Sequence, residues 1–342
     1  MTRLTALLGL ELPLLQAGMG AVAGPALCVE VSRAGAGGTL ALYKEPPARA
    51  AHLAREVAAA ARGRPFGVNV IPEVTGPDRC LEQLRAVLPE LPRNAFVTVF
   101  GLPADDAART VRAAGHPLVV QVGTAADADT ALARGAVVLV LQGTEAGGHL
   151  LGRQPVDSLL ATVRSRHPHA VLAVAGGIAT GEDLADAVAR GADGAMAGTL
   201  FVPAAESAAH PEFKRRVVEA VAEDTLITSL FEIGWPHRPH RVLHNSLTAA
   251  AERAPAAFIA TTQVDGRPYP VPRYSAAAPG ATTTGRIQEM AMYCGRSCSR
   301  VTAPRPAALT IARIRREYEN ARAPRADSHT STFPAPHRIQ EK

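Results

Sequence analysis

A single histidine, His149, stands at the end of a glycine-rich stretch that could support proton transfer. The stretch 142–149 follows an apolar run, 136–141, that is typical of a buried parallel strand. When parallel strands close into a barrel, residues at their carboxyl ends carry the chemistry, and an imidazole with a pKa near 6.5 can take or give a proton there. Glu145, four residues earlier, either orients the imidazole or is a solvated loop residue.

Two further loops carry glycines that suit a phosphate group. Ala175, Gly176 and Gly177 follow one apolar run, and Gly198 and Thr199 end the next. In barrels of alternating strands and helices, the loops after the seventh and eighth strands often hold a phosphate through exposed backbone N–H groups. The alternative is that these glycines only make tight turns. Because both loops stand at the expected positions, we favour a phosphate-bearing ligand, such as flavin mononucleotide (FMN), a sugar phosphate or a nucleotide.

The rest of such a ligand would need close backbone and polar edges. The short segment Ala17, Gly18 and Met19, at the end of the first apolar run, offers a backbone with little steric hindrance. Asn69 and Gln121 end two other apolar strands, and a buried amide must find hydrogen-bond partners. The pyrimidine edge of an isoalloxazine ring would satisfy both amides. Hydrogen bonds to neighbouring backbone are the alternative.

These residues are spaced by a regular alternation of apolar runs and helical segments over about 200 residues. Eight such units predict a closed (β/α)8 barrel, a TIM barrel of the α/β class, rather than an open sheet of five or six strands. The predicted strands are 12–19, 39–42, 65–71, 95–100, 117–122, 136–141, 170–175 and 194–200.

The alternation ends after residue 201, and the chain then divides into three further parts. Residues 1–222 are predicted to form the barrel, and residues 223–285, rich in proline, a smaller inserted α-rich domain on the substrate side. Residues 286–321 are predicted to return to the barrel, with amphipathic helices over 286–293 and 305–321. Residues 322–342 are polar and proline-containing, which predicts a disordered tail.

Composition and charge exclude several classes of protein. The net charge is +5, but no basic stripe with interleaved aromatic residues is present, so we expect no nucleic-acid partner. Four cysteines in 342 residues do not make a disulfide scaffold, and His149 has no sequence-near partner that would suggest a metal site. No signal peptide and no apolar run of about 18 residues is found, so we expect no membrane association and a cytoplasmic location.

Several segments, in a fixed order from about Leu12 to Ala321, together match one family. They are 15–20 (LQAGMG), 66–69 (FGVN), 121–124 (QVGT), 143–149 (GTEAGGH), 175–179 (AGGIA), 191–201 (GADGAMAGTLF), 206–207 (ES), 210–214 (HPEFK) and 292–297 (MYCGRS). The chain resembles the nitronate monooxygenase family, formerly called 2-nitropropane dioxygenases. That family also includes the flavin-dependent enoyl-acyl-carrier-protein reductase of the FabK type.

The resemblance implies a (β/α)8 barrel with tightly bound FMN and oxidation of a nitronate by O2 to a carbonyl compound and nitrite. His149 would be the acid/base or substrate hydrogen-bonding residue, able to remove the α-proton of a neutral nitroalkane. The cofactor would be held by the matching residues Ala17, Gly18, Met19, Asn69, Gln121, Gly148, Ala175, Gly176, Gly177, Gly198, Thr199, Tyr293, Gly295 and Ser297. A small substrate and O2 would be its partners, in a monomer or homodimer.

The sequence departs from the family pattern at three places. Gly18 stands where the family usually has proline, and Cys294 and Arg296 stand in a segment that usually reads Tyr-Ala-Gly-Gln. The insert from Arg238 to Gly285 matches weakly. Arg296 either recognises an anionic substrate or is a surface residue.

These departures leave the substrate open. An enoyl-thioester reductase that uses NAD(P)H and a specialised flavin oxidase of secondary metabolism share the same cofactor loops. A non-catalytic barrel is disfavoured because the glycine loops and His149 are intact.

Overall fold

Eight parallel strands form the centre of the molecule, in the order β1-β9-β8-β6-β5-β4-β3-β2. The computed structural model describes residues 1–42, 44–264 and 267–323. A bridge between Leu15 and Gly37 joins the two ends of the strand order, so the sheet closes into the predicted (β/α)8 barrel. The strands are β1 (Leu14–Gln16), β2 (Gly38–Ala41), β3 (Phe66–Val70), β4 (Phe96–Phe100), β5 (Leu118–Val122), β6 (Val138–Gln142), β8 (Val171–Ala175) and β9 (Gly194–Ala197).

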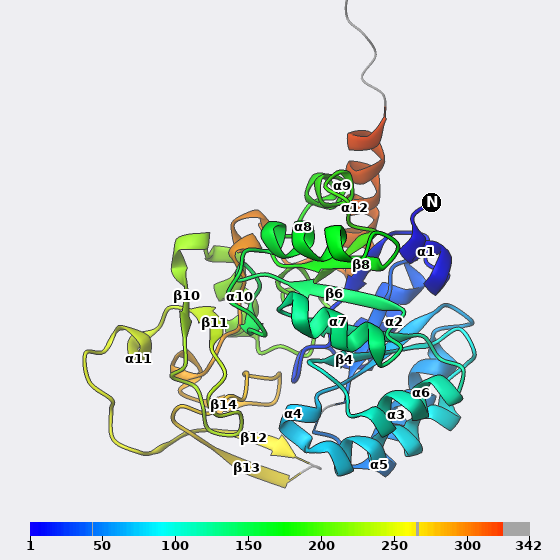
Figure 1. The fold of residues 1–342 in the computed structure, drawn as a ribbon. Coiled ribbons are helices and arrows are strands. Elements are labelled where there is room, and N and C mark those ends of the chain that lie inside the picture. Colours follow the sequence, from blue (N-terminus) through cyan, green and yellow to red (C-terminus); the bar gives the residue numbers. More distant parts are fainter. Residues whose placement is uncertain (43, 265–266, 324–342) are drawn as a thin grey trace, which may run out of the picture.

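Helices cover the outside of the barrel (Figure 1). Threonines begin two of them, because the hydroxyls of Thr124 and Thr180 accept from backbone N–H groups of the first turn. The last helix packs against α9 and α2, as expected for the predicted return to the barrel. The main helices are α2 (Pro25–Arg33), α3 (Pro47–Ala60), α4 (Pro72–Thr75), α5 (Pro77–Val87), α6 (Asp105–Ala113), α7 (Ala125–Ala133), α8 (Val156–Arg166), α9 (Gly181–Ala189), α10 (Pro211–Glu219) and α12 (Ala307–Arg322).

The amino-terminal end of the barrel is closed by a short helix, α1 (Arg3–Leu8). Leu4 and Leu8 join one apolar cluster with side chains inside the barrel, such as Val138 and Met196. Arg3 of this helix also forms an ion pair with Asp193, immediately before β9. Since this end is filled, only the carboxyl ends of the strands are left for a ligand.

The insert is built mainly of strands, so the expectation of an α-rich inserted domain is wrong for the residues described. The insert adds β10 and β11 to β7, which belongs to the strand-six loop, in the antiparallel sheet β10-β11-β7. It also forms the antiparallel sheet β13-β12-β14 and one short helix, α11 (Ser246–Ala249). The prolines of this segment suggested irregular structure, and its strands were therefore not recognised. Proline is nevertheless tolerated in edge strands such as β13. The strands are β7 (Gly148–His149), β10 (Thr225–Thr228), β11 (His240–Leu243), β12 (Phe258–Val264), β13 (Arg267–Pro272) and β14 (Thr284–Gly285).

The segment after the insert also differs from the prediction. Residues 286–293 contain only a single turn of 3-10 helix, Ile287–Glu289, instead of an amphipathic helix. The predicted helix over 305–321 is confirmed by α12. Residues 324–342, most of the predicted tail, lie outside the described residues.

Candidate active site

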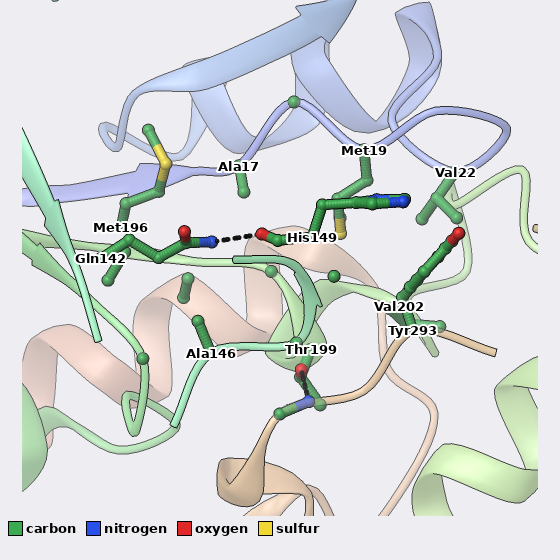
Figure 2. A pocket seen from close by; sticks show the side chains of 18 of the residues that line it. Ala17, Met19, Val22, Gln142, Ala146, His149, Met196, Thr199, Val202 and Tyr293 are labelled. Carbon is green, nitrogen blue, oxygen red and sulfur yellow. Dashed lines mark hydrogen bonds between the residues drawn. The ribbon is translucent and has the colours of Figure 1, made fainter. Parts of the chain in front are cut away.

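A pocket opens at the carboxyl ends of the barrel strands, and it gathers the predicted site residues. Figure 2 shows Ala17, Met19, His149, Thr199 and Tyr293 around it. All residues predicted from the sequence line this pocket except Asn69; those that do are Ala17, Gly18, Met19, Gln121, Gly148, His149, Ala175, Gly176, Gly177, Gly198, Thr199, Tyr293, Gly295 and Ser297.

The two glycine loops both line the pocket. Gly176 and Gly177 have φ angles of 118° and 79°, which an L side chain rarely adopts. A Cβ added at Gly177 would meet no atom within 4 Å, so this backbone borders open space. The hydroxyl of Thr199 accepts from the Gly295 N–H at 2.9 Å (Figure 2). Arg300 donates to the Gly177 carbonyl at 2.6 Å, and its guanidinium is also paired with Asp183 at 3.1 Å.

Asn69 is the one predicted residue that the pocket wall does not include. Its amide nitrogen donates to the hydroxyl of Thr98 at 2.9 Å, and its buried Oδ1 has no hydrogen-bond partner. The residue packs instead against Gly18, where an added Cβ would overlap the Asn69 side chain. Gly18, in place of the proline usual in the family, therefore lets Asn69 lie directly against the backbone of the pocket wall. Gln121, the other predicted amide, does line the pocket.

The backbone of His149 is held from two sides. Gln142, at the end of β6, donates to the His149 carbonyl at 2.9 Å and accepts from the Leu151 N–H at 2.9 Å (Figure 2). On the other side, β7 pairs with β11 of the insert, with His149 opposite His240. The sequence placed His149 at the end of strand six but gave no sign of either support. His149 thus lies in a loop of the barrel, and pairing with β11 of the insert holds its backbone in place.

The imidazole of His149 lies within a group of aromatic rings. It stacks on the indole of Trp235, with ring centroids 3.7 Å apart and planes 15° from parallel. The rings of His240 and Tyr293 lie 5.0 and 5.1 Å away. The Nε2 atom is buried and has no hydrogen-bond partner among the residues that the structure describes. Because a buried polar atom normally has a hydrogen-bond partner, the lack of one here indicates that a ligand in the pocket supplies it.

Burial lowers the pKa of His149 to about 2, with smaller contributions from His240, Arg238 and Lys44. The expectation that this imidazole titrates near 6.5 is therefore wrong, because the sequence does not reveal how far the ring is removed from water. His240 is also buried, and its Nδ1 lies 2.9 Å from the Arg238 carbonyl while its Nε2 accepts from the Phe231 N–H at 3.3 Å. Both rings are thus neutral near pH 7.

Glu145 does not orient His149, and it is not simply a solvated residue. Its carboxylate accepts from the Val156 N–H at 3.1 Å, at the start of α8, where negative charge is favourable.

Arg296 has an exposed side chain and is not part of the pocket wall, so the structure supports the alternative that it is a surface residue. Its backbone N–H donates to the Glu145 carbonyl at 3.0 Å.

Close packing also explains why glycine is needed in the strand-six loop. A Cβ added at Gly147 would overlap the backbone of Cys294 and Gly295, and one added at Gly295 would overlap Gly147. The loop therefore packs backbone to backbone against the segment after the insert. This close approach brings Tyr293 and Gly295 to the pocket.

The apolar part of the pocket was missed by sequence reasoning. It includes Trp235 from the insert, which is the only tryptophan of the chain. Its being the single tryptophan was the one feature of the sequence that could have suggested Trp235 as a site residue. Further apolar wall residues are Val22, Ile71, Phe100, Ala146, Ile178, Met196, Ala197, Val202, Phe213, Ala276 and Ala278.

The described residues contain neither a metal-ligand cluster nor a membrane-spanning helix. Within 1–42, 44–264 and 267–323, His, Cys, Asp and Glu side chains do not gather in threes as a metal site would need. No helix in these ranges has the length and hydropathy to cross a membrane. All four cysteines are free and buried.

Residues 1–317 match the family model described as nitronate monooxygenase. The chain belongs to this family. Its members are flavin-dependent oxidoreductases with a TIM-barrel fold, which agrees with the barrel, the glycine loops and the pocket described above.

Similar proteins within this group differ in what they do. A Rhodococcus jostii protein named (3aS,4S,5R,7aS)-5-hydroxy-7a-methyl-1-oxo-octahydro-1H-indene-4-carboxyl-CoA dehydrogenase is 31% identical over 258 residues, 74% of this chain and 68% of that protein. A solved FabK variant from Thermotoga maritima is 26% identical, with a TM-score of 0.72 over 94% of this chain and 97% of that chain. A nitroalkane oxidase from Streptomyces ansochromogenes is 27% identical, with a TM-score of 0.71 over 93% and 99%.

Proposed function

We propose that this protein is an FMN-dependent nitronate monooxygenase. It oxidises a nitronate with O2 to a carbonyl compound and nitrite, and His149 is the residue that donates a hydrogen bond to the substrate. The observation that carries the proposal is the buried Nε2 of His149. This atom has no partner among the described residues, and His149 lines the same pocket as the two glycine loops. Family membership and the likeness to a nitroalkane oxidase support the same reaction class.

The pocket residues fit FMN. Gly176, Gly177 and Thr199 offer backbone and hydroxyl groups for a terminal phosphate, and Gln121 offers an amide for the polar edge of the ring. The backbone of Ala17 to Met19 forms the wall beside it. When bound, FMN supplies an electron-accepting ring, whereas the residues of this chain bind the substrate, exclude water and handle the proton.

The neutral state of His149 bears on which form of the substrate is used. An imidazole with a pKa of about 2 is a weak base for removing a proton from a neutral nitroalkane. A nitronate needs no such step, and its negative oxygens can accept a hydrogen bond from the Nε2–H tautomer. An anion next to the ring also raises the pKa of His149 again. We therefore propose the nitronate as the preferred substrate.

The test begins with the visible spectrum of the purified protein, which should show flavin bands, and with identification of the released cofactor as FMN. A nitronate should then bleach the bands without oxygen and release nitrite in air. At equal concentration the neutral nitroalkane should react more slowly. Protein that binds FMN but gives no nitrite from a series of nitronates would refute the proposal.

An enoyl-thioester reductase is the second candidate, favoured by the likeness to FabK and to a CoA-ester dehydrogenase. This activity would require a reduced nicotinamide cofactor. Rapid anaerobic bleaching of the flavin by NADH or NADPH, followed by reoxidation with an enoyl-CoA, would support it. The absence of bleaching by either nucleotide would exclude it.

A further inference from the structure

The connection between β10 and β11 places Trp235 directly over the imidazole of His149. The two rings are nearly parallel at 3.7 Å, and the side chains are buried, with residue exposures of 8% and 6%. The indole is held in turn by Phe100, whose ring meets it edge-on at 5.4 Å and 83°. Ile71 and Ala276 belong to the same apolar cluster. This packing leaves the indole little freedom to move away from His149.

The backbone on both sides of Trp235 is anchored. Before it, the Ile233 N–H donates to the Tyr274 carbonyl at 3.0 Å, and the Ala276 N–H donates to the Ile233 carbonyl at 2.9 Å. After it, Arg238 makes a two-pronged ion pair with Glu73 of α4 at 2.7 and 3.0 Å. The loop is therefore attached both to the insert and to the barrel.

We propose that Trp235 is a positioning residue for His149: its indole covers one face of the imidazole, keeps water from that face and aims Nε2 into the pocket. The inference rests on the proposed function in taking His149 as the reacting group. It adds that the insert, and not only the barrel, sets the orientation and the protonation of this group.

The charges around the imidazole agree with a shielded, neutral ring. His240 faces it from β11, Arg238 from the residues before β11, and Lys44 from the segment after β2; each disfavours a second positive charge. Glu73 is the acidic partner of Arg238 and offsets part of its charge. The stacked indole has two opposing effects, because it excludes water but attracts an imidazolium through its π face. The low pKa of His149 indicates that exclusion of water dominates.

The single tryptophan provides a direct test on the whole protein. A protonated imidazole quenches a neighbouring indole more strongly than a neutral one does. Emission from the wild-type protein should therefore be constant between about pH 5 and 9, the range in which an exposed histidine would titrate. A quenching step near pH 6.5 that disappears in His149→Gln would show that the ring is not shielded, and would overturn the proposal. The His237→Gln variant controls for the exposed imidazole two residues along the chain from Trp235.

Substitutions then separate positioning from general stability. In Trp235→Ala, modification of His149 by diethylpyrocarbonate, followed by peptide mass spectrometry, should be about tenfold faster because one face becomes open to water. Trp235→Phe should restore the wild-type rate. As a matched control, Phe258→Ala removes a large aromatic ring of the insert that is 69% exposed, and it should change nothing.

The same variants connect shielding to turnover. With the nitronate that the wild-type protein oxidises, Trp235→Ala should lose kcat and acquire a pH dependence near 6.5, with FMN content unchanged, and Trp235→Phe should recover both. Equal rates of His149 modification in wild type and Trp235→Ala would overturn the inference. Failure of the wild-type protein to produce nitrite would refute the proposed function instead, and the modification and fluorescence results would stand independently.

Discussion

The side-chain amide of Gln142 holds the backbone of His149 on the far side of the loop that separates them, with a distance of 2.9 Å between the amide nitrogen and the carbonyl oxygen. Its oxygen accepts from the Leu151 N–H, so one side chain fixes both flanks of the histidine. Gln142 ends β6 and is buried with an exposure of 3%. A rigid strand end thereby positions a residue in a loop, which is how precise sites are usually built.

Loss of this support should reduce turnover and leave the cofactor bound. In Gln142→Leu, the His149 carbonyl and the Leu151 N–H lose their partner, and the imidazole can shift relative to the substrate. We expect kcat to fall by about 10²-fold, as small misplacements of reacting groups do. FMN content, measured from the absorbance ratio of the purified protein, should equal that of wild type. An unchanged kcat would show that β11 alone positions His149.

Gln121 should behave in the opposite way. Its side chain lines the pocket, where we assign it to the polar edge of FMN. Gln121→Leu should therefore weaken FMN binding by about tenfold, the loss of roughly one hydrogen bond of about 1.4 kcal/mol. Fluorescence titration of apoprotein with FMN measures this. The pair Gln121→Leu and Gln142→Leu distinguishes cofactor binding from positioning with the same substitution at two amides that line the pocket.

Replacement of His149 should remove turnover without removing the flavin. His149 lines the pocket, and its Nε2 has no partner among the described residues. We expect His149→Asn to keep its flavin spectrum and to lose at least about 10²-fold in kcat with a nitronate. If nitrite production persisted at the wild-type rate, the assignment of His149 would be wrong.

The low pKa of His149 also predicts how stability depends on pH. Its pKa is about 2 in the folded protein and about 6.5 when unfolded, so below pH 6.5 the unfolded state binds a proton that the folded state does not. The contribution of His149 to the free energy of unfolding is thus fully present above the unfolded-state pKa. It is lost as the pH drops toward the folded-state pKa. The slope from this group approaches roughly 1.4 kcal/mol per pH unit.

Denaturant unfolding of wild type and His149→Gln between about pH 7 and 4 tests this slope. The free energy of unfolding of the wild-type protein should fall more steeply, because glutamine does not titrate. Parallel curves would mean that His149 is protonated in the folded protein over this range.

Gly18 should not tolerate a side chain. A Cβ at this position would overlap Asn69, which lies directly against the pocket wall. Gly18→Ala should therefore shift one of the two segments, weaken FMN binding and destabilise the protein by about 1–3 kcal/mol, the usual range for overpacking. Gly24→Ala is a matched control, because a Cβ there meets no atom within 4 Å. Thermal unfolding and FMN titration of both variants would show whether the effect belongs to Gly18.

The sequence alone was sufficient for the barrel and for most of the pocket. Each buried strand is a continuous apolar run, and such runs are local features that need no knowledge of distant contacts. The glycine loops after β8 and β9 were found for the same reason, because their position relative to the strands fixes their place at the rim. The insert was predicted poorly, because its strands are short, contain prolines and pair with partners far apart in the chain, as β12 and β14 do.

What the tertiary structure decided is the environment of the residues that the sequence had already singled out. His149 was recognised from its loop. Its neutral state, however, depends on burial under Trp235, which lies 86 positions away in the sequence and excludes water from the imidazole. Glu145 was recognised as a neighbour of His149, yet its partner is the Val156 N–H. Asn69 ends its strand as predicted but faces Gly18 rather than the pocket. Burial and pairing are properties of contacts between distant segments, so only the folded chain determines them.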